Sequence, residues 1–346
     1  MKEVEKFNLE NAANTPIVKD LRGLLDTLVV KDLKNIGDLF LINRLSNKRR
    51  NELIEIIYNV LTDENKLSEV VERFIDKEFD LLKKLMKNEG IIQDNYVSVE
   101  NYHFLYMLGI VFIFRRNNKF YISITDDVYN VFKKIDLKKF DKIIDENTKV
   151  YNLLKSMVEL YGVVSYGDLM DSYCYYYAKD DFVDVPTNAL YFCERLDNIS
   201  HIHTDDNSYF VNSILTHNKF ERILDDIVSR QVEIKRKPIK LNELLKYNNT
   251  FYYEETTSRK NFKQYLRKNK ISEDVIEIIM INMINMFKLG HSFVEVVIAM
   301  LEDYGLEITE NNIQEIINYL IIIYNNTRIW RNNGWTPLEM RKEYKY

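Results

Sequence analysis

Helix-breaking residues are rare in this sequence of 346 residues. It contains only nine glycines and four prolines, the two residue types that most often interrupt helices and form turns. The long uninterrupted stretches favour helices over a turn-rich all-β fold. Neither GxGxxG nor GxxxxGK[ST] occurs. We therefore expect no dinucleotide-binding fold and no P-loop ATPase.

The chain is long enough to form two or three packed units. Hydrophobic residues make up 46% of it and aromatic residues 13%, so a large core is available. The formal net charge is -5, whereas dedicated nucleic-acid-binding proteins are usually basic. A local basic patch on an acidic protein still attracts phosphates, with an affinity that falls as salt rises. Any nucleic-acid site must therefore be local.

The cysteine pattern indicates a reducing compartment. Cys174 and Cys193 are the only two cysteines, they lie far apart, and they show no pairing pattern. No secretory hydrophobic segment opens the chain, and no apolar run approaches the roughly 20 residues that span a bilayer. We expect a cytoplasmic protein without membrane association.

Helical periodicity begins after a polar arm over residues 1–20. Residues 21–61 predict two short helices, a basic link and a closing helix, for which Ser46 is the predicted N-cap. Another helix is predicted over residues 65–88. The first part of the chain is therefore helical.

Two hairpins interrupt the helices. The segment GIVFIFRRNNKFYISI alternates on both sides of Asn117-Asn118, which is typical of a hairpin whose turn tolerates positive φ. The segment ISHIHTDDNSYFVNSI predicts a second hairpin. NNKFYI, from Asn117, and DNSYFV, from Asp206, match about 89 residues apart. This spacing lies in the range where an internal duplication is worth testing, and helices followed by a hairpin predict two winged-helix-like modules.

The predicted fold class is mainly α with small β-hairpins, an α+β protein. The predicted segments are an arm (1–20), a helix-extension-helix module (21–64), two winged-helix-like modules (65–146 and 147–216) and a C-terminal helical domain (217–346). Helices with wide apolar faces are expected near 272–288, 291–304 and 309–329, and these should pack as a bundle.

The first candidate nucleic-acid site is the basic link. Arg44, Lys48, Arg49 and Arg50 are the residues that we expect to contact phosphate oxygens. Arg49 and Arg50 fall in the first turn of the predicted closing helix, where the helix dipole disfavours cations. The alternative interpretation is a solvated helix cap that keeps the protein soluble.

The second candidate site is the first hairpin. Arg115, Arg116 and Lys119 gather three cations around its turn, and such wings often contact the backbone or minor groove of DNA. The alternative is that the charges protect edge strands from aggregation. The second hairpin carries Asp205, Asp206 and Asn207 instead, which would repel phosphate.

Three further clusters raise the question of catalysis. His201 and His203 would share one face of a strand, but no third metal ligand is fixed. Asp180-Asp181 and Asp225-Asp226 lack the accompanying residues of a nuclease. The tyrosines of YCYYY, from Tyr173, lack the Arg and His residues that activate a nucleophile. We expect no catalytic residues, no metal and no cofactor.

Residues 21–61 resemble the small helix-extension-helix module at the N-terminus of the transcription terminator Rho, and in related form SAP domains. Leu28, Leu33 and Ile36, the basic link from Ser46 and the ELIE segment from Glu52 carry this resemblance. The module implies nucleic-acid association.

The whole layout resembles a group of largely uncharacterised proteins from low-GC Gram-positive bacteria and their mobile elements. Three segments match: the Leu-Gly pair with the hairpin that follows it, over Leu108 to Ser123; LLKY, from Leu244; and YNNTRIWRNNGWTP, from Tyr324. Members of that group often end in a Cys-rich zinc knuckle, which has no counterpart before Tyr346, so the zinc inference is not carried over to this sequence.

The leading hypothesis is a non-enzymatic regulatory protein that binds DNA or RNA through its basic N-terminal module. The alternative is a protein-interaction adaptor or inhibitor that grips a protein partner with its helical C-terminal half.

Overall fold

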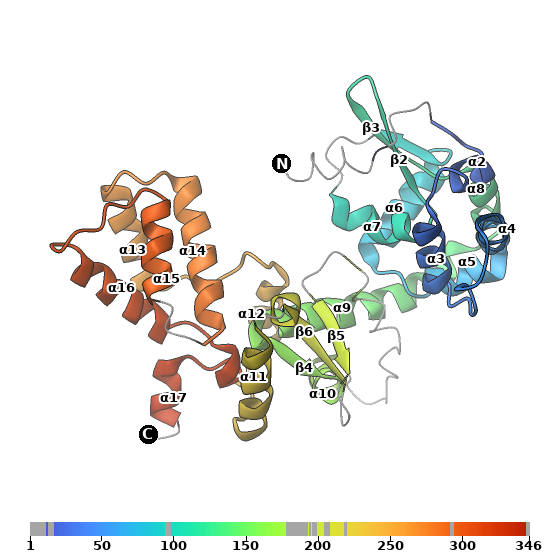
Figure 1. Ribbon diagram of the computed structural model, residues 1–346. Helices are drawn as coiled ribbons and strands as arrows, with labels where there is room; N and C mark the ends of the chain where they lie inside the picture. The colour runs from blue at the N-terminus through green and yellow to red at the C-terminus, as the bar shows by residue number, and fades with distance from the viewer. Residues whose placement is uncertain are drawn as a thin grey trace. The chain divides into compact units, whose positions relative to one another are not determined.

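The computed structural model describes residue 12 and residues 17–93, 98–177, 193, 195, 199–203, 208–217, 220–290 and 294–343. The fold is mainly helical with small antiparallel three-stranded sheets (Figure 1), so the predicted fold class is confirmed at this level. The chain divides into two compact units. Unit 1 comprises Met1–Tyr151 and Pro186–Asp197, and unit 2 comprises Asn152–Val185 and Asn198–Tyr346. None of the described helices is long and apolar enough to cross a bilayer.

Unit 1 combines helices with one small sheet around a single core. Leu33, Ile57 and Phe114 are fully buried in that core, so the N-terminal helices share it with the first hairpin. Its elements are α2 (Leu21–Leu25), α3 (Val30–Leu39), α4 (Arg50–Leu61), α5 (Glu64–Val71), α6 (Asp76–Lys87), β1 (Ile91–Gln93), α7 (Val99–Met107), β2 (Phe112–Arg116), β3 (Lys119–Ser123), α8 (Asp126–Phe132) and the 3-10 helix η1 (Leu137–Phe140).

The predicted N-cap of the closing helix is wrong. Helix α4 begins at Arg50 with Arg49 as its N-cap, not at Ser46. The Arg49 backbone N–H donates to Glu52 Oε2 at 2.9 Å. A glutamate three residues into a helix often satisfies the N-cap N–H in this way, and Glu52 places the helix start at Arg50.

The helix predicted over residues 65–88 is also wrong, because the chain bends between α5 and α6. Phe74 and Ile75 in the bend are buried. Asn147 Nδ2 donates to the carbonyls of Glu72 and Phe74 at 2.7 and 3.0 Å. A side chain distant in sequence thus satisfies the backbone acceptors that the interrupted helix leaves open.

The two sheets have the same topology. The strand order is β1-β3-β2 in unit 1 and β4-β6-β5 in unit 2, and every neighbouring pair is antiparallel. Both predicted hairpins are confirmed. The third strand of each sheet is not predicted, because three residues are too few to show alternation.

A glycine with positive φ precedes the added strand of each sheet. Gly90 has φ 80° and Gly162 has φ 77°. The Gly90 carbonyl accepts from Ile124 N and the Gly162 carbonyl from Asn212 N, both at 2.8 Å. In the structure Ile124 therefore corresponds to Asn212. This correspondence is shifted by one residue from the predicted sequence match, which pairs Asn117 with Asp206. The sequence match aligns aromatic residues, whereas the structure aligns backbone positions.

Unit 2 contains the second sheet and the C-terminal helices. Helix α9 begins in unit 1 and ends in unit 2, and α13 to α16 pack around one apolar core that includes Phe262, Met283 and Leu320. The elements are α9 (Asp141–Tyr161), β4 (Val163–Ser165), α10 (Tyr166–Tyr177), β5 (Ile199–His203), β6 (Ser208–Asn212), η3 (Ser213–Thr216), α11 (Glu221–Glu233), α12 (Leu241–Leu244), η5 (Leu245–Asn248), α13 (Thr257–Lys268), α14 (Glu273–Lys288), α15 (Val294–Asp303), α16 (Ile313–Asn325), η6 (Trp330–Asn332) and α17 (Pro337–Glu343).

Candidate nucleic-acid interface

The turn between β2 and β3 carries three cations. Asn117 and Asn118 both have positive φ, at 50° and 57°, which is the backbone of a type I′ hairpin turn. Arg116 and Lys119 flank the turn, lie directly opposite each other across the two strands and are exposed. Arg115 Nη2 donates to Asn118 Oδ1 at 3.0 Å. We call Arg115, Arg116 and Lys119 the tip cations.

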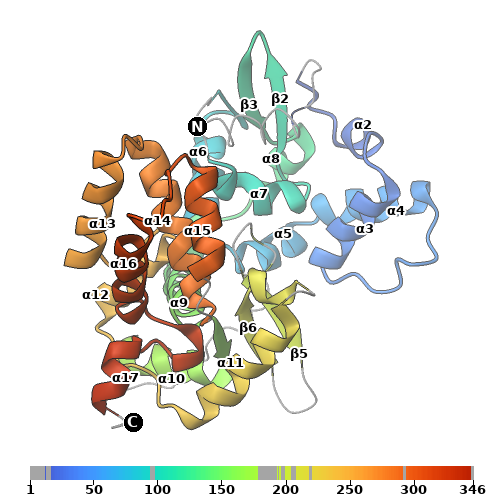
Figure 2. The same cartoon turned by 60° about the vertical axis from the view of Figure 1, so that its left-hand side comes forward.

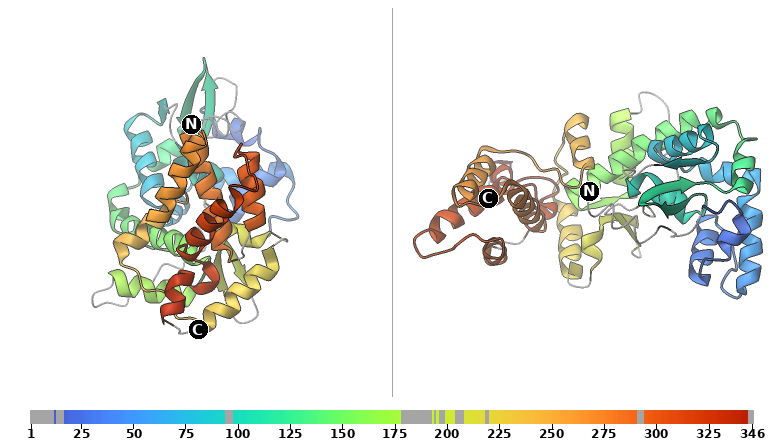
Figure 3. Two further views of the ribbon diagram at one scale, coloured as in Figure 1. Left: turned by 90° about the vertical axis from the view of Figure 1, so that its left-hand side faces the viewer. Right: turned by 90° about the horizontal axis from the view of Figure 1, so that it is seen from above.

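The tip cations have no carboxylate partner among the described residues. Two like charges directly opposite each other in a hairpin repel, so the Arg116–Lys119 pair does not stabilise the turn. The hairpin projects away from the helices of unit 1 (Figures 2 and 3). The tip is therefore accessible, and an anion placed there would relieve the repulsion.

Two of the four link cations are engaged within unit 1. Lys48 Nζ lies 3.1 Å from Glu52 Oε1. Arg50 Nη1 lies 2.7 Å from Asp26 Oδ1, and its other terminal nitrogen donates to the carbonyls of Asp26 and Leu28. Arg50 thus ties the start of α4 to the end of α2. Arg50 therefore stabilises the fold of unit 1.

The other two link cations are exposed. Arg44 adopts positive φ, at 65°. Neither its side chain nor that of Arg49 has an ion-pair partner within the described part of the chain. Figures 1 and 2 show the α3–α4 link and the β2–β3 tip at separate ends of unit 1. The two predicted basic groups therefore do not form one continuous patch.

A groove of about 290 Å³ lies at the base of β2. Burial raises the pKa of the Tyr106 phenol, and the charge of Asp32 raises it further, so the phenol keeps its proton at neutral pH. The residues that line the groove include Leu28, Asp32, Asn35, Tyr106, Met107 and Phe112. Sequence reasoning missed this groove. The only signal was the spacing of Asp32 and Asn35, which places both on one helix face.

Two of the other predicted clusters cannot be placed, and the described residues of the remaining ones are not gathered into a metal site. Asp205, Asp206 and Asn207, and likewise Asp180-Asp181, lie outside the described residues. Asp226 forms an ion pair with Arg331 at 3.4 Å. The described part of the chain contains no group of three or more His, Cys, Asp or Glu residues that could hold a metal ion.

Unit 2 contains a cavity of about 350 Å³ whose lining includes Glu159, Asn212, His217 and Trp330. Lys288 Nζ donates to Glu159 Oε1, and Asn212 Nδ2 donates to Glu159 Oε2 at 3.3 Å. Both charged side chains are buried. Because their charges compensate each other, the pair supplies no net positive charge for a phosphate.

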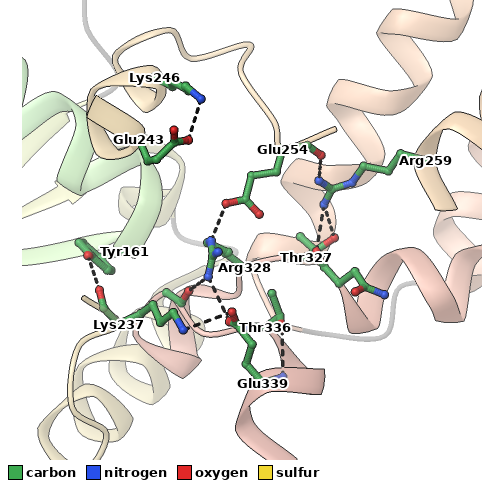
Figure 4. Close-up of polar contacts among 12 residues, drawn as sticks. Tyr161, Lys237, Glu243, Lys246, Glu254, Arg259, Thr327, Arg328, Thr336 and Glu339 are labelled. Carbon is green, nitrogen blue, oxygen red and sulfur yellow. Dashed lines mark hydrogen bonds and ion pairs between the residues drawn. The ribbon is translucent and has the colours of Figure 1, made fainter. Parts of the chain in front are cut away.

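Arg328, near the C-terminus, belongs to a structural network (Figure 4). Arg328 Nε lies 2.8 Å from Glu254 Oε1, and Arg328 Nη1 lies 3.1 Å from Glu339 Oε2. Lys237 Nζ lies 3.3 Å from Glu339 Oε1. These contacts join the segment after α16, α17 and the segments before α12 and α13, so Arg328 is not available as a phosphate contact.

Comparisons of the chain with protein-family models, with curated proteins and with solved structures gave no match.

Proposed function

We propose that this protein binds nucleic acid without catalysis, and that the tip cations of the β2–β3 hairpin are its main phosphate contact. The observation that carries the proposal is the exposed cross-strand pair of Arg116 and Lys119. Cations held at the end of a rigid hairpin are positioned for contact with a phosphate backbone. The function would be regulatory, in a bacterium or its mobile elements.

The topology of the sheet supports this proposal. The chain order of a helix, a short strand, a second helix and a hairpin, with the strand order β1-β3-β2, supports a winged-helix-like interpretation, in which the β2–β3 hairpin would be the wing. The helix before the wing, α7, has the sequence VENYHFLYM and carries no Lys or Arg. We therefore propose backbone contact by the wing without reading of the major groove by α7.

The link residues Arg44, Lys48 and Arg49 are secondary in this proposal. Arg44 and Arg49 are exposed and Lys48 holds a partly exposed ion pair, a kind of interaction that contributes little to stability. Lys48 can therefore exchange Glu52 for a phosphate at small cost. Arg50 is not one of the proposed phosphate contacts, because its guanidinium is engaged with Asp26.

The test is a fluorescence-anisotropy titration of the full chain with labelled DNA and RNA at several salt concentrations. The double variant Arg116→Glu, Lys119→Glu should weaken binding and reduce the slope of log K against log salt by about two. A matched control is Lys134→Glu, Lys138→Glu, which makes the same charge change at exposed positions of unit 1. Equal losses in both variants would overturn the proposed site.

A second candidate function is the protein-interaction adaptor. Ile321 and Ile322 on α16 are 46% and 48% exposed, which is high for neighbouring large apolar residues. Failure of the chain to bind either nucleic acid, together with stoichiometric capture of a protein partner that Ile321→Asp abolishes, would favour the adaptor.

A further inference from the structure

The groove at the base of β2 combines aromatic walls with hydrogen-bond acceptors. Tyr106 and Phe112 contribute rings, and Asp32 and Asn35 contribute a carboxylate and a carboxamide. Its volume of about 290 Å³ lies near the lower end of the range for small-ligand sites. The groove therefore suits one small, flat molecule that carries N–H donors.

We infer that this groove holds one unstacked base of a single-stranded nucleic acid, and that guanine is the base it prefers. The inference rests on the proposed function, because the tip cations would hold the phosphates of the same strand. Phe112 and Arg116 are the two ends of β2. At 3.3 Å per residue they lie roughly 13 Å apart, a distance that a few nucleotides cross.

The aromatic side chains supply the affinity for a base. Stacking of a base on an aromatic ring contributes about 1–3 kcal/mol and works for every base, because each base has a π-face. Tyr106 is half-buried and is the ring that a base can reach. Phe112 is only 8% exposed, so it supports the groove and offers little area for stacking. A duplex keeps its bases stacked, so only a single strand can place a base in the groove.

Asp32 and Asn35 supply the preference for guanine over the other bases. Asp32 and Asn35 lie three residues apart on α3 and therefore on one face. Neither side chain has a hydrogen-bond partner among the described residues, so both are free to accept from a ligand. Guanine presents two adjacent N–H groups that a carboxylate can accept together. Uracil and thymine present one N–H between two carbonyl oxygens, which the carboxylate of Asp32 would repel.

The experiment compares two labelled strands on the full chain. One is a run of ten thymidines and the other carries a single central deoxyguanosine; the RNA counterparts contain uridine and guanosine. The natural chain should bind the guanine-containing strand about 5- to 150-fold more tightly, the range expected for one bidentate contact.

The variant Asp32→Asn should bring this ratio close to one. Because Asp32 is exposed, the substitution should not disturb folding. The matched control is Asp38→Asn, also exposed on α3 but outside the groove, and it should keep the ratio.

The outcomes separate the two proposals. If both strands bind equally and the reversal at Arg116 and Lys119 weakens both, the proposed function stands and the inference fails. A guanine preference that persists in Asp32→Asn also overturns the inference. If the natural chain binds neither strand, or the reversal has no effect, the proposed function itself fails.

Discussion

Arg195 and Glu78 form a buried, two-pronged ion pair across 117 residues of sequence. Arg195 Nε lies 2.6 Å from Glu78 Oε1, and Arg195 Nη2 lies 2.8 Å from Glu78 Oε2. Glu78 Oε2 also accepts from Ile75 N at 3.0 Å. The carboxylate therefore caps α6 and at the same time anchors residue 195 within unit 1.

Removing one partner of this pair should strongly destabilise unit 1. Arg195→Met leaves the Glu78 carboxylate, which is fully buried, without a counter-charge. Loss of one member of a buried pair costs about 3–5 kcal/mol. Urea unfolding of Arg195→Met, Glu78→Gln and the double variant measures the coupling. A coupling energy near zero would contradict the pair's role.

Gly162 should be much less tolerant of alanine than Gly305. Both have positive φ, at 77° and 89°, so either substitution costs about 1–2 kcal/mol of backbone strain. A Cβ at Gly162 would lie 2.5 Å from the Trp330 ring, whereas a Cβ at Gly305 has no neighbour within 4 Å. Overpacking should add about 1–3 kcal/mol at Gly162. Thermal and urea unfolding of Gly162→Ala and Gly305→Ala would show equal losses if this packing argument is wrong.

Arg50 and its neighbour Arg49 should differ in their effect on stability. Arg50→Met removes the ion pair with Asp26 and hydrogen bonds to two carbonyls, and we expect a loss of about 1 kcal/mol in the free energy of unfolding. Arg49→Met removes an exposed side chain and should leave stability unchanged. Arg49→Met should instead weaken nucleic-acid binding slightly. The prediction is contradicted if chemical denaturation gives both variants the same midpoint.

Asp168 should contribute stability that acid removes. Burial raises the pKa of Asp168, but the charge of Arg236 and hydrogen bonds from Ser165 outweigh burial and hold it below its ordinary value of 3.8. Because the folded-state pKa is lowered, the contribution is present above the unfolded pKa and is lost as pH falls through the folded pKa.

The measurement is the unfolding free energy of the natural chain and of Asp168→Asn as a function of pH. Their difference should be constant from neutral pH to about pH 5 and should shrink below pH 3.8. Asp171→Asn is the control, because Asp171 is exposed on the same helix. A difference that grows on acidification would contradict the assignment.

Local sequence signals predicted both hairpins and the C-terminal helices. Asn117-Asn118 predicted the first hairpin because asparagine tolerates the positive φ that the turn requires. The C-terminal helices appear close to their predicted ranges, for example α14 at Glu273–Lys288, because their apolar periodicity runs without interruption. The basic residues of the tip were also predicted, since they lie beside the turn in the sequence.

Contacts between distant segments decided the rest. The break before α6 depends on Asn147, and the anchoring of residue 195 depends on Glu78; in each case the partner is far away in sequence. The same holds for Arg50, which the sequence marks as one cation of a basic run and which the fold engages with Asp26.

The sequence by itself therefore determined where helices and hairpins form and where positive charge gathers, because periodicity, turn residues and charge are local properties. Only the tertiary structure decided which cations remain free, that each hairpin gains a third strand, and that Tyr106 and Phe112 meet Asp32 and Asn35 in one groove. These features depend on which distant side chains compete for the same charge, carbonyl or apolar surface, and that competition exists only once the chain is folded.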